Sequence, residues 1–165
     1  MSLDDVRDEL IATAEALGRP GTGLLAADES TGTIGKRFAA IGVENSEANR
    51  RAYRTLLATA PELGSAISGV ILYEETLFQD ADPAVAAAGS ADDSAEATSI
   101  VELFQRQGII PGIKVDQGVA PLAGGLSGES WCTGLQGLAE RAARYYARGA
   151  RFAKWRAVLQ ITAAG

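Results

Sequence analysis

Residues 67–73 read Ile-Ser-Gly-Val-Ile-Leu-Tyr, a run of apolar and small side chains without a charge. Three further runs with few charges begin at residues 23, 109 and 152, so that successive runs start 44, 42 and 43 residues apart. Short apolar runs that alternate with helices are typical of buried parallel strands in βαβ units. The regular spacing therefore predicts an α/β fold built from repeated strand–helix units.

The predicted elements follow from these runs and from the apolar spacing between them. Four strands are expected, over residues 23–27, 67–73, 109–115 and 152–159. Four helices are expected, over residues 3–17 and then from Ser46, from near Asp92, and from near Thr133 to just before Gly149. Residues 80–96 and 118–128 are rich in Gly, Ala, Ser and Asp and are predicted to be connecting loops.

Composition excludes several classes of function. The chain has 165 residues, the length of one ordinary domain, and a net charge of -6, which argues against nucleic-acid binding. It has no histidine, which excludes a His-assisted nucleophile, a His general base and imidazole ligation of zinc. Cys132 is the single cysteine and favours a reducing compartment. With no signal peptide and no window of ~18 apolar residues, a cytoplasmic protein without a membrane partner is expected.

Basic residues point to candidate chemistry. Of the 15 basic residues twelve are arginine, and only Lys36, Lys114 and Lys154 are lysine. Lysine can lose its proton near neutral pH and attack a carbonyl, whereas guanidinium cannot. In a chain biased towards arginine, the three lysines are therefore the first candidates for a catalytic amine.

Charged residues also cluster where predicted strands end. Asp28 and Glu29 follow the first run directly, and α/β folds gather their sites at such ends. Lys154 and Arg156 alternate within the fourth run, which places them on one face of a strand. Two cations on one buried face require an anion, and a phosphate ester would satisfy that need. A structural network with Asp28 or Glu29 would satisfy it equally.

Two glycine patterns do not carry their usual meaning. The Gly-rich residues 21–26 precede a strand, whereas a dinucleotide fingerprint must follow one. Residues 32–37 end in Gly-Lys-Arg, which is too short for a P-loop and lacks its Ser or Thr. The segment can still surround a phosphate by charge, with Thr33, Lys36 and Arg37 as candidates.

Four blocks of sequence together resemble one enzyme family. They are LAADESTGTIGKR at 25–37, GVILYEETL at 69–77, GIKVDQG at 112–118 and FAKWR at 152–156. In order and in spacing they are similar to the motifs of class I fructose-bisphosphate aldolases, over nearly the whole chain. The resemblance implies a TIM (β/α)8 barrel, of which residues 1–165 would form a single N-terminal portion with the first four strand–helix units.

The resemblance also implies a reaction. Class I aldolases are lyases of glycolysis and gluconeogenesis that reversibly cleave fructose 1,6-bisphosphate to dihydroxyacetone phosphate and glyceraldehyde 3-phosphate. They work through a lysine imine (Schiff base), without metal or cofactor, and the imine stabilises the carbanion left by C3–C4 cleavage. The expected partners are these sugar phosphates and, in the full-length family, other copies of the chain.

Family roles transfer onto matched positions. Asp28 would take part in proton transfer, Lys114 would place positive charge near the sugar hydroxyls and phosphate, and Lys154 would assist formation and dehydration of the carbinolamine. Arg156 would hold a substrate phosphate. Three further positions match the phosphate end of the family's site: Thr33, Lys36 and Arg37.

One departure from the family is large. The family's imine-forming lysine lies on the sixth strand and its proton-transfer glutamates on the fifth, whereas this sequence ends at Gly165, soon after the fourth predicted strand. Residues 1–165 are therefore expected to lack the imine lysine and to be inactive alone. The alternatives are a non-catalytic half-barrel that binds a phosphosugar or a partner chain, and a different phosphosugar lyase on the same barrel. A half-barrel is expected to expose two strand edges.

Overall fold

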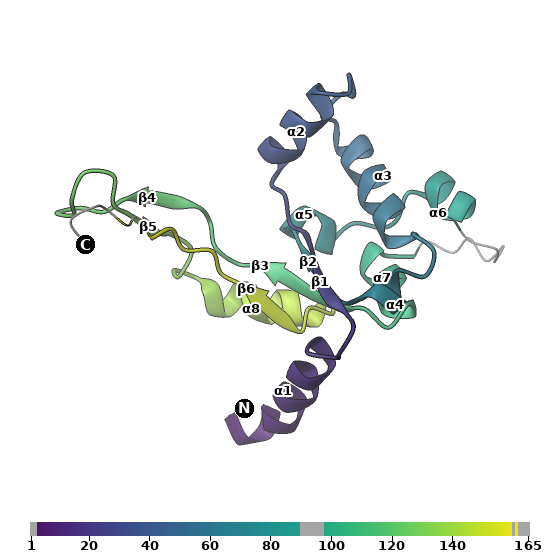
Figure 1. The fold of residues 1–165 in the computed structure, drawn as a ribbon, viewed down its shortest axis with the longest axis horizontal. Coiled ribbons are helices and arrows are strands. Elements are labelled where there is room, and N and C mark those ends of the chain that lie inside the picture. Colours follow the sequence, from purple (N-terminus) through teal and green to yellow (C-terminus); the bar gives the residue numbers. More distant parts are fainter. Residues whose placement is uncertain (1–2, 90–97, 160, 162–165) are drawn as a thin grey trace.

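A computed structural model describes residues 3–89, 98–159 and 161 (Figure 1). Its centre is a parallel sheet of four strands: β1 (Gly23–Ala27), β2 (Ile67–Leu72), β3 (Ile110–Lys114) and β6 (Phe152–Lys154). The sheet order is β1-β2-β3-β6, the same as the order along the chain. The predicted α/β fold with repeated parallel units is confirmed, because each new strand pairs beside the preceding one, as the strands of a barrel do.

Burial explains why these segments form strands. In β2 and β3 most side chains are buried, as expected for strands covered on both faces. Gly112 of β3 permits close packing, because a Cβ atom there would lie 2.4 Å from the ring of Phe152 on β6. In register, Lys114 pairs with Lys154, so two lysines are neighbours at the ends of adjacent strands.

Eight helices are described, and most of them connect consecutive strands. α1 (Leu3–Leu17) precedes β1, and α2 (Thr31–Ala39), α3 (Glu47–Ala58) and α4 (Leu63–Ala66) join β1 to β2. α5 (Glu74–Leu77), α6 (Pro83–Gly89) and α7 (Ile100–Arg106) lie between β2 and β3, and α8 (Leu138–Ala147) precedes β6. None of the helices in the described parts of the chain has the length and apolar character needed to cross a bilayer.

The hydrophobic core lies between the sheet and the helices that cover it. Its largest fully buried apolar side chains come from β2, α5 and the α7–β3 segment: Val70, Leu72, Leu77, Ile100, Phe104 and Ile109. At the start of α7, Ser99 and Glu102 form a capping box, in which Ser99 Oγ accepts from Glu102 N at 3.2 Å and Glu102 Oε2 accepts from Ser99 N at 2.8 Å. The helix that carries Phe104 is therefore held at its first turn.

The predicted helix positions are partly confirmed. α1 matches the expected range, and α3 begins after the N-cap Ser46, whose Oγ accepts from Asn49 N at 3.2 Å. The predicted helix start near Asp92 lies outside the described residues. The fourth helix begins at Leu138 and not near Thr133, because Gly134 and Gly137 adopt φ values of +117° and +66° that no helix allows.

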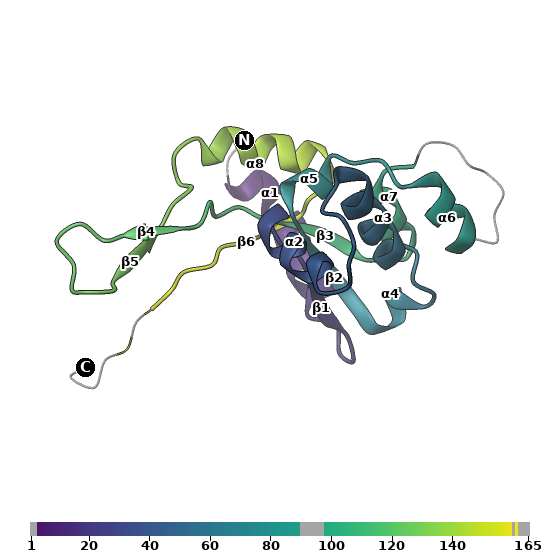
Figure 2. The same cartoon turned by 90° about the horizontal axis from the view of Figure 1, so that it is seen from above.

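Both predicted loops contain regular structure, which corrects the sequence prediction. Within residues 80–96, Asp82 Oδ1 accepts from Ala84 N and Val85 N, and Pro83 occupies the first position of α6. Within residues 118–128, β4 (Val119–Pro121) begins and pairs antiparallel with β5 (Ser130–Cys132). Figures 1 and 2 show this hairpin projecting well away from the parallel sheet.

The fourth parallel strand is shorter than predicted. β6 ends at Lys154, whereas the apolar run predicted a strand to residue 159. Its neighbour β3 ends at Lys114, and the chain then leaves the sheet towards the hairpin. The last backbone hydrogen bond between the two segments is from Val115 N to Lys154 O at 3.1 Å, and Arg156 N then donates to the Asp116 side chain at 3.2 Å. A strand cannot continue where its neighbour no longer offers backbone groups.

Candidate active site

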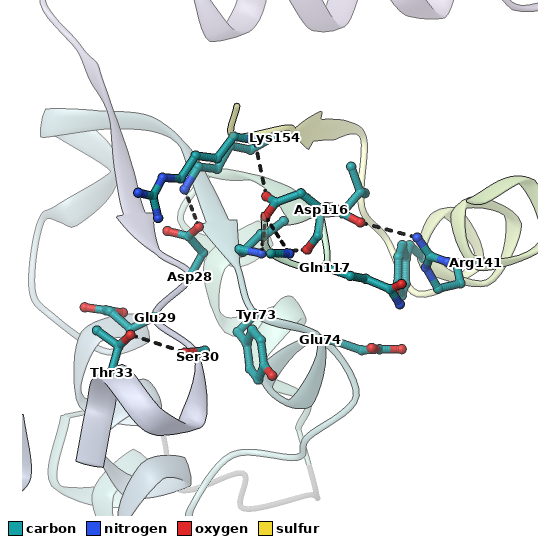
Figure 3. Close-up of a pocket in the computed structure, with 15 residues that line it drawn as sticks. Asp28, Glu29, Ser30, Thr33, Tyr73, Glu74, Asp116, Gln117, Arg141 and Lys154 are labelled. Carbon is teal, nitrogen blue, oxygen red and sulfur yellow. Dashed lines mark hydrogen bonds and ion pairs between the residues drawn. The ribbon is translucent and has the colours of Figure 1, made fainter. Parts of the chain in front are cut away.

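A pocket of about 620 Å³ opens at the carboxyl ends of the four parallel strands. Each strand contributes residues at or just after its end, which is where barrel enzymes place their sites. Figure 3 shows the side chains that converge there. The lining residues are Asp28, Glu29, Ser30, Thr33, Tyr73, Glu74, Lys114, Val115, Asp116, Gln117, Gly118, Arg141, Tyr145, Lys154 and Arg156.

Asp28 and Lys154 form an ion pair across the pocket. Asp28 is the first residue after β1 and is buried, and Lys154 Nζ lies 2.5 Å from its Oδ2. Their strands are at opposite edges of the sheet, three strand spacings of about 4.8 Å apart. A single lysine side chain spans this distance only because the sheet curves towards the pocket. The contact between Lys154 and Asp28 therefore indicates that the sheet is curved, as the wall of a barrel is.

Lys114 forms a separate ion pair, with Asp116. Its Nζ donates to Asp116 Oδ1 at 2.7 Å and to the Asp116 backbone oxygen at 2.6 Å. Because Lys114 and Lys154 are neighbours in the sheet register, their ammonium groups would repel each other at this edge. Separate partners, Asp116 for one and Asp28 for the other, offset that repulsion.

Asp116 is ionised at neutral pH in this setting. Burial acts to raise the pKa of its carboxyl, but hydrogen bonds from Lys114 and from the backbone of Arg156, the Lys114 charge, and the Gly118 N–H together lower it below its ordinary value of 3.8. Asp116 was not among the residues that the sequence pointed to. It stands two residues beyond Lys114, and that proximity to a predicted lysine is the signal that could have identified it.

Glu29 anchors the segment that carries Asp28. It forms ion pairs with Arg37 of α2 and with Arg54 of α3, the latter at 2.6 Å between Arg54 Nη1 and Glu29 Oε2. Arg54 Nη2 also donates to the Glu29 backbone oxygen at 3.0 Å. Of the network that the sequence allowed between Lys154 or Arg156 and these two acidic residues, the structure shows the Lys154–Asp28 pair. Glu29 is instead paired with two arginines of the neighbouring helices.

Glu29 makes folding sensitive to acid. Burial acts to raise the pKa of its carboxyl, but the hydrogen bond and charge of Arg54, a backbone hydrogen bond and the charge of Arg37 lower the pKa below its ordinary value of 4.5.

A carboxyl whose pKa is lowered on folding stabilises the folded state above its unfolded pKa, and this contribution is lost as the pH falls. Stability is therefore expected to decline as the pH falls from about 4.5 through the lowered pKa of the folded state. Urea unfolding followed by circular dichroism at pH 3 to 7 measures this decline, and Glu29→Gln should make it shallower. An unchanged pH dependence in Glu29→Gln would refute this role.

The structure brings together five of the seven site residues named from the sequence. Asp28, Lys114 and Lys154, the three catalytic candidates, all line the pocket, as do Thr33 and Arg156. Thr33 Oγ1 lies 3.2 Å from Ser30 Oγ at the start of α2. Their roles stay predictions.

Lys36 and Arg37 do not line the pocket. Both are exposed on α2, and the Arg37 side chain, 59% exposed, is engaged by Glu29. The expectation that they hold a phosphate therefore stays a prediction without support from this geometry. Of the three lysines, Lys114 and Lys154 line the pocket and Lys36 does not.

Sequence reasoning missed several lining residues. Tyr73 and Glu74 follow β2 directly, so the strand-end rule that identified Asp28 would have identified them as well. Arg141 reaches the pocket from α8 and donates to the backbone oxygens of Val115 and Gly134 at 3.3 and 2.5 Å, which no local pattern indicates. Tyr145 of α8 is buried in the core and is also one of the residues that line the pocket.

Cys132 holds the hairpin against the chain after β6. Its Sγ lies 3.3 Å from the backbone oxygen of Gly118 and 2.6 Å from that of Arg156, and its single S–H can donate to either.

Comparison with known proteins agrees with this arrangement. The family model described as fructose-bisphosphate aldolase class-I matches residues 9–165. The chain is 55% identical to the fructose-bisphosphate aldolase, chloroplastic, of Oryza sativa subsp. japonica and 54% identical to fructose-bisphosphate aldolase 2, chloroplastic, of Pisum sativum, each over 154 residues. These matches cover 93% of this chain but 36% and 40% of the relatives. The names place both relatives in chloroplasts, so they give the predicted cytoplasmic location no support.

A solved structure matches the fold as well. The fructose-bisphosphate aldolase of Plasmodium falciparum, crystallised with TRAP and a small-molecule inhibitor, superposes with a TM-score of 0.86 at 48% sequence identity. The match covers 97% of this chain and 42% of that one, so the chain spans about two fifths of its relatives' length. Sequence motifs, sheet order, pocket position and family match agree, and the chain belongs to the class I fructose-bisphosphate aldolase family.

Proposed function

We propose that this chain supplies the proton- and phosphate-handling side of an enzyme that reversibly cleaves fructose 1,6-bisphosphate to dihydroxyacetone phosphate and glyceraldehyde 3-phosphate. The observation that carries the proposal is the Lys154–Asp28 pair, which faces Lys114 and Arg156 in one pocket at the strand ends. These three basic residues line the pocket together with a fourth cation, Arg141, and cations suit a bisphosphorylated sugar because phosphate is bound by charge-assisted hydrogen bonds.

The geometry supports distinct roles for the pair. Lys154 holds a proton 2.5 Å from a buried carboxylate, so a proton can pass between Lys154 and the substrate while Asp28 keeps the lysine oriented. A neighbouring lysine amine would be easier to deprotonate beside the Lys154 charge, which favours attack on the substrate carbonyl.

Lys114 and Arg156 suit substrate binding more than proton transfer. Lys114 lines the pocket and is held by Asp116, so its charge is available to polar groups of a bound sugar. Arg156 lies on an exposed segment at the pocket rim, where a guanidinium can bind a phosphate with two parallel hydrogen bonds. By resemblance, the imine lysine comes from the part of the barrel beyond the fourth strand, and the assembled enzyme would be a homo-oligomer.

A chimera tests this proposal. Residues 1–165 are joined to the portion of the rice relative that lies beyond the matched segment, and cleavage of fructose 1,6-bisphosphate is followed by coupled oxidation or reduction of the triose products. The expected result is cleavage by the chimera and none by residues 1–165 alone. A chimera with the circular dichroism and melting behaviour of the rice enzyme but no cleavage would contradict the proposal. It would favour the non-catalytic half-barrel, which binds a phosphosugar without cleaving it.

A further inference from the structure

Asp116 lies at the junction of three segments. It follows β3 by two residues, its residue exposure is 7%, and both of its carboxylate oxygens are used. Oδ1 accepts from Lys114 Nζ at 2.7 Å and, at 3.4 Å, from Gly118 N at the start of the hairpin. Oδ2 accepts from Arg156 N at 3.2 Å, forty residues further along the chain.

The Asp116 carboxylate accepts the first hydrogen bond beyond the end of the backbone pairing between β3 and β6. The backbone contact between β3 and the end of β6 stops at Val115 N, which donates to Lys154 O. One residue later, the Asp116 side chain supplies the acceptor that a neighbouring strand would otherwise provide to Arg156 N. The direction of the chain at Arg156 therefore depends on Asp116, which binds its backbone N–H, together with Cys132, which contacts its backbone oxygen.

The same side chain restricts Lys114. A lysine has four side-chain torsions, and an ammonium group at a pocket edge samples many of their combinations. The Asp116 carboxylate and backbone oxygen, at 2.7 and 2.6 Å from Nζ, select one of them. The ammonium is thereby held in place before a ligand arrives, which lowers the cost of ordering it.

We propose that Asp116 is a positioning residue, which fixes the Lys114 ammonium and the backbone of Arg156 so that the two cations present one arrangement to the substrate. This role rests on the proposed function, but the geometry it requires can be measured without catalysis. Only a carboxylate meets the requirement. An amide has one acceptor and one donor, so asparagine would leave either the ammonium or the Arg156 N–H facing an NH₂ group.

The first experiment uses residues 1–165 and the small number of lysines. With ¹³C-labelled lysine the chain gives three Cε resonances, assigned by single Lys→Met substitutions. Asp116→Asn is expected to move the Lys114 resonance and the Arg156 backbone amide and to leave Lys36 on α2 in place. Asp8→Asn, on the exposed face of α1, is the matched control and should move none of them. If Asp116→Asn leaves Lys114 and Arg156 in place, the proposal is wrong.

A second variant, Lys114→Met, tests the proposal even if Asp116→Asn does not fold. Lys114 is partly exposed, so Lys114→Met preserves the fold more readily. Because Lys114 helps to lower the Asp116 pKa, its loss should raise that pKa, and ¹³C titration of the carboxyl measures it. An unchanged Asp116 titration would contradict the coupling.

A double-mutant cycle in the chimera then separates positioning from general stability. Asp116→Asn is expected to lower kcat/KM for fructose 1,6-bisphosphate by about 10- to 100-fold, since small displacements of binding groups have effects of this size. In a Lys114→Met background the same substitution should lower kcat/KM less, because the part of its effect that acts through Lys114 is gone. Equal losses in both backgrounds would overturn the proposal. If the unsubstituted chimera is inactive, the proposed function fails, and the resonance shifts still decide the role of Asp116.

Discussion

Lys154→Met is expected to lower kcat of the chimera for fructose 1,6-bisphosphate by about 10³-fold, within the range for a lost acid–base group. The substitution removes the amine that lies 2.5 Å from Asp28 and leaves that buried carboxylate without its cation. Steady-state cleavage assays measure the change, with circular dichroism as the check on folding. Arg7→Met, which removes an exposed cation on α1, is the matched control and should retain activity.

Lys154→Arg distinguishes proton handling from charge. Arginine keeps the positive charge opposite Asp28 but does not release a proton near neutral pH. Its loss of kcat should therefore be close to that of Lys154→Met. A Lys154→Arg variant with near-normal kcat would contradict the proton-transfer role and leave only a structural ion pair.

Arg54→Met is expected to lower the free energy of unfolding of the chain by about 3 kcal/mol, the lower end of the range for breaking a buried ion pair. Arg54 is 3% exposed, and its loss would leave the Glu29 carboxylate with only the outer arginine. Because Glu29 adjoins Asp28, the end of β1 should loosen as well. Urea unfolding at pH 7 measures the effect.

Arg37→Met is the matched comparison for Arg54→Met. It removes the other cation on Glu29, but its side chain is 59% exposed, and surface ion pairs contribute about 0–1 kcal/mol. The loss should therefore be much smaller than for Arg54→Met. Equal losses in the free energy of unfolding at the two positions would show that burial does not determine how much each ion pair contributes to stability.

The fold was predictable because it depends on local patterns repeated along the chain. The apolar runs at residues 23, 67 and 109 gave strand positions within about one residue, since burial of β2 and β3 leaves a continuous apolar signal. The fourth strand was predicted too long because its end depends on where β3 stops, and a single run of residues contains no such information. The hairpin was missed because its strands are three residues each.

The site was predictable to the extent that its residues follow strands. Asp28 and Lys154 were named from their positions, although their contact joins residues 126 apart in sequence. Arg54, Arg141 and the contact of Asp116 with the backbone of Arg156 escaped prediction because the groups that they contact lie on other elements. For Arg54 the partner is the carboxylate of Glu29, and for Arg141 the partners are the carbonyls of Val115 and Gly134. Contacts of this kind are decided by packing, which sequence spacing does not report.

Borohydride trapping with dihydroxyacetone phosphate tests the central claim most directly. After reduction, mass spectrometry locates the lysine that carries the sugar phosphate. If this chain provides the proton- and phosphate-handling side of a Schiff-base aldolase, the chimera should carry one adduct, on a lysine of the portion supplied by the rice relative, and residues 1–165 alone should carry none. An adduct on Lys114 or Lys154 would contradict the account and identify that lysine as the imine-forming residue.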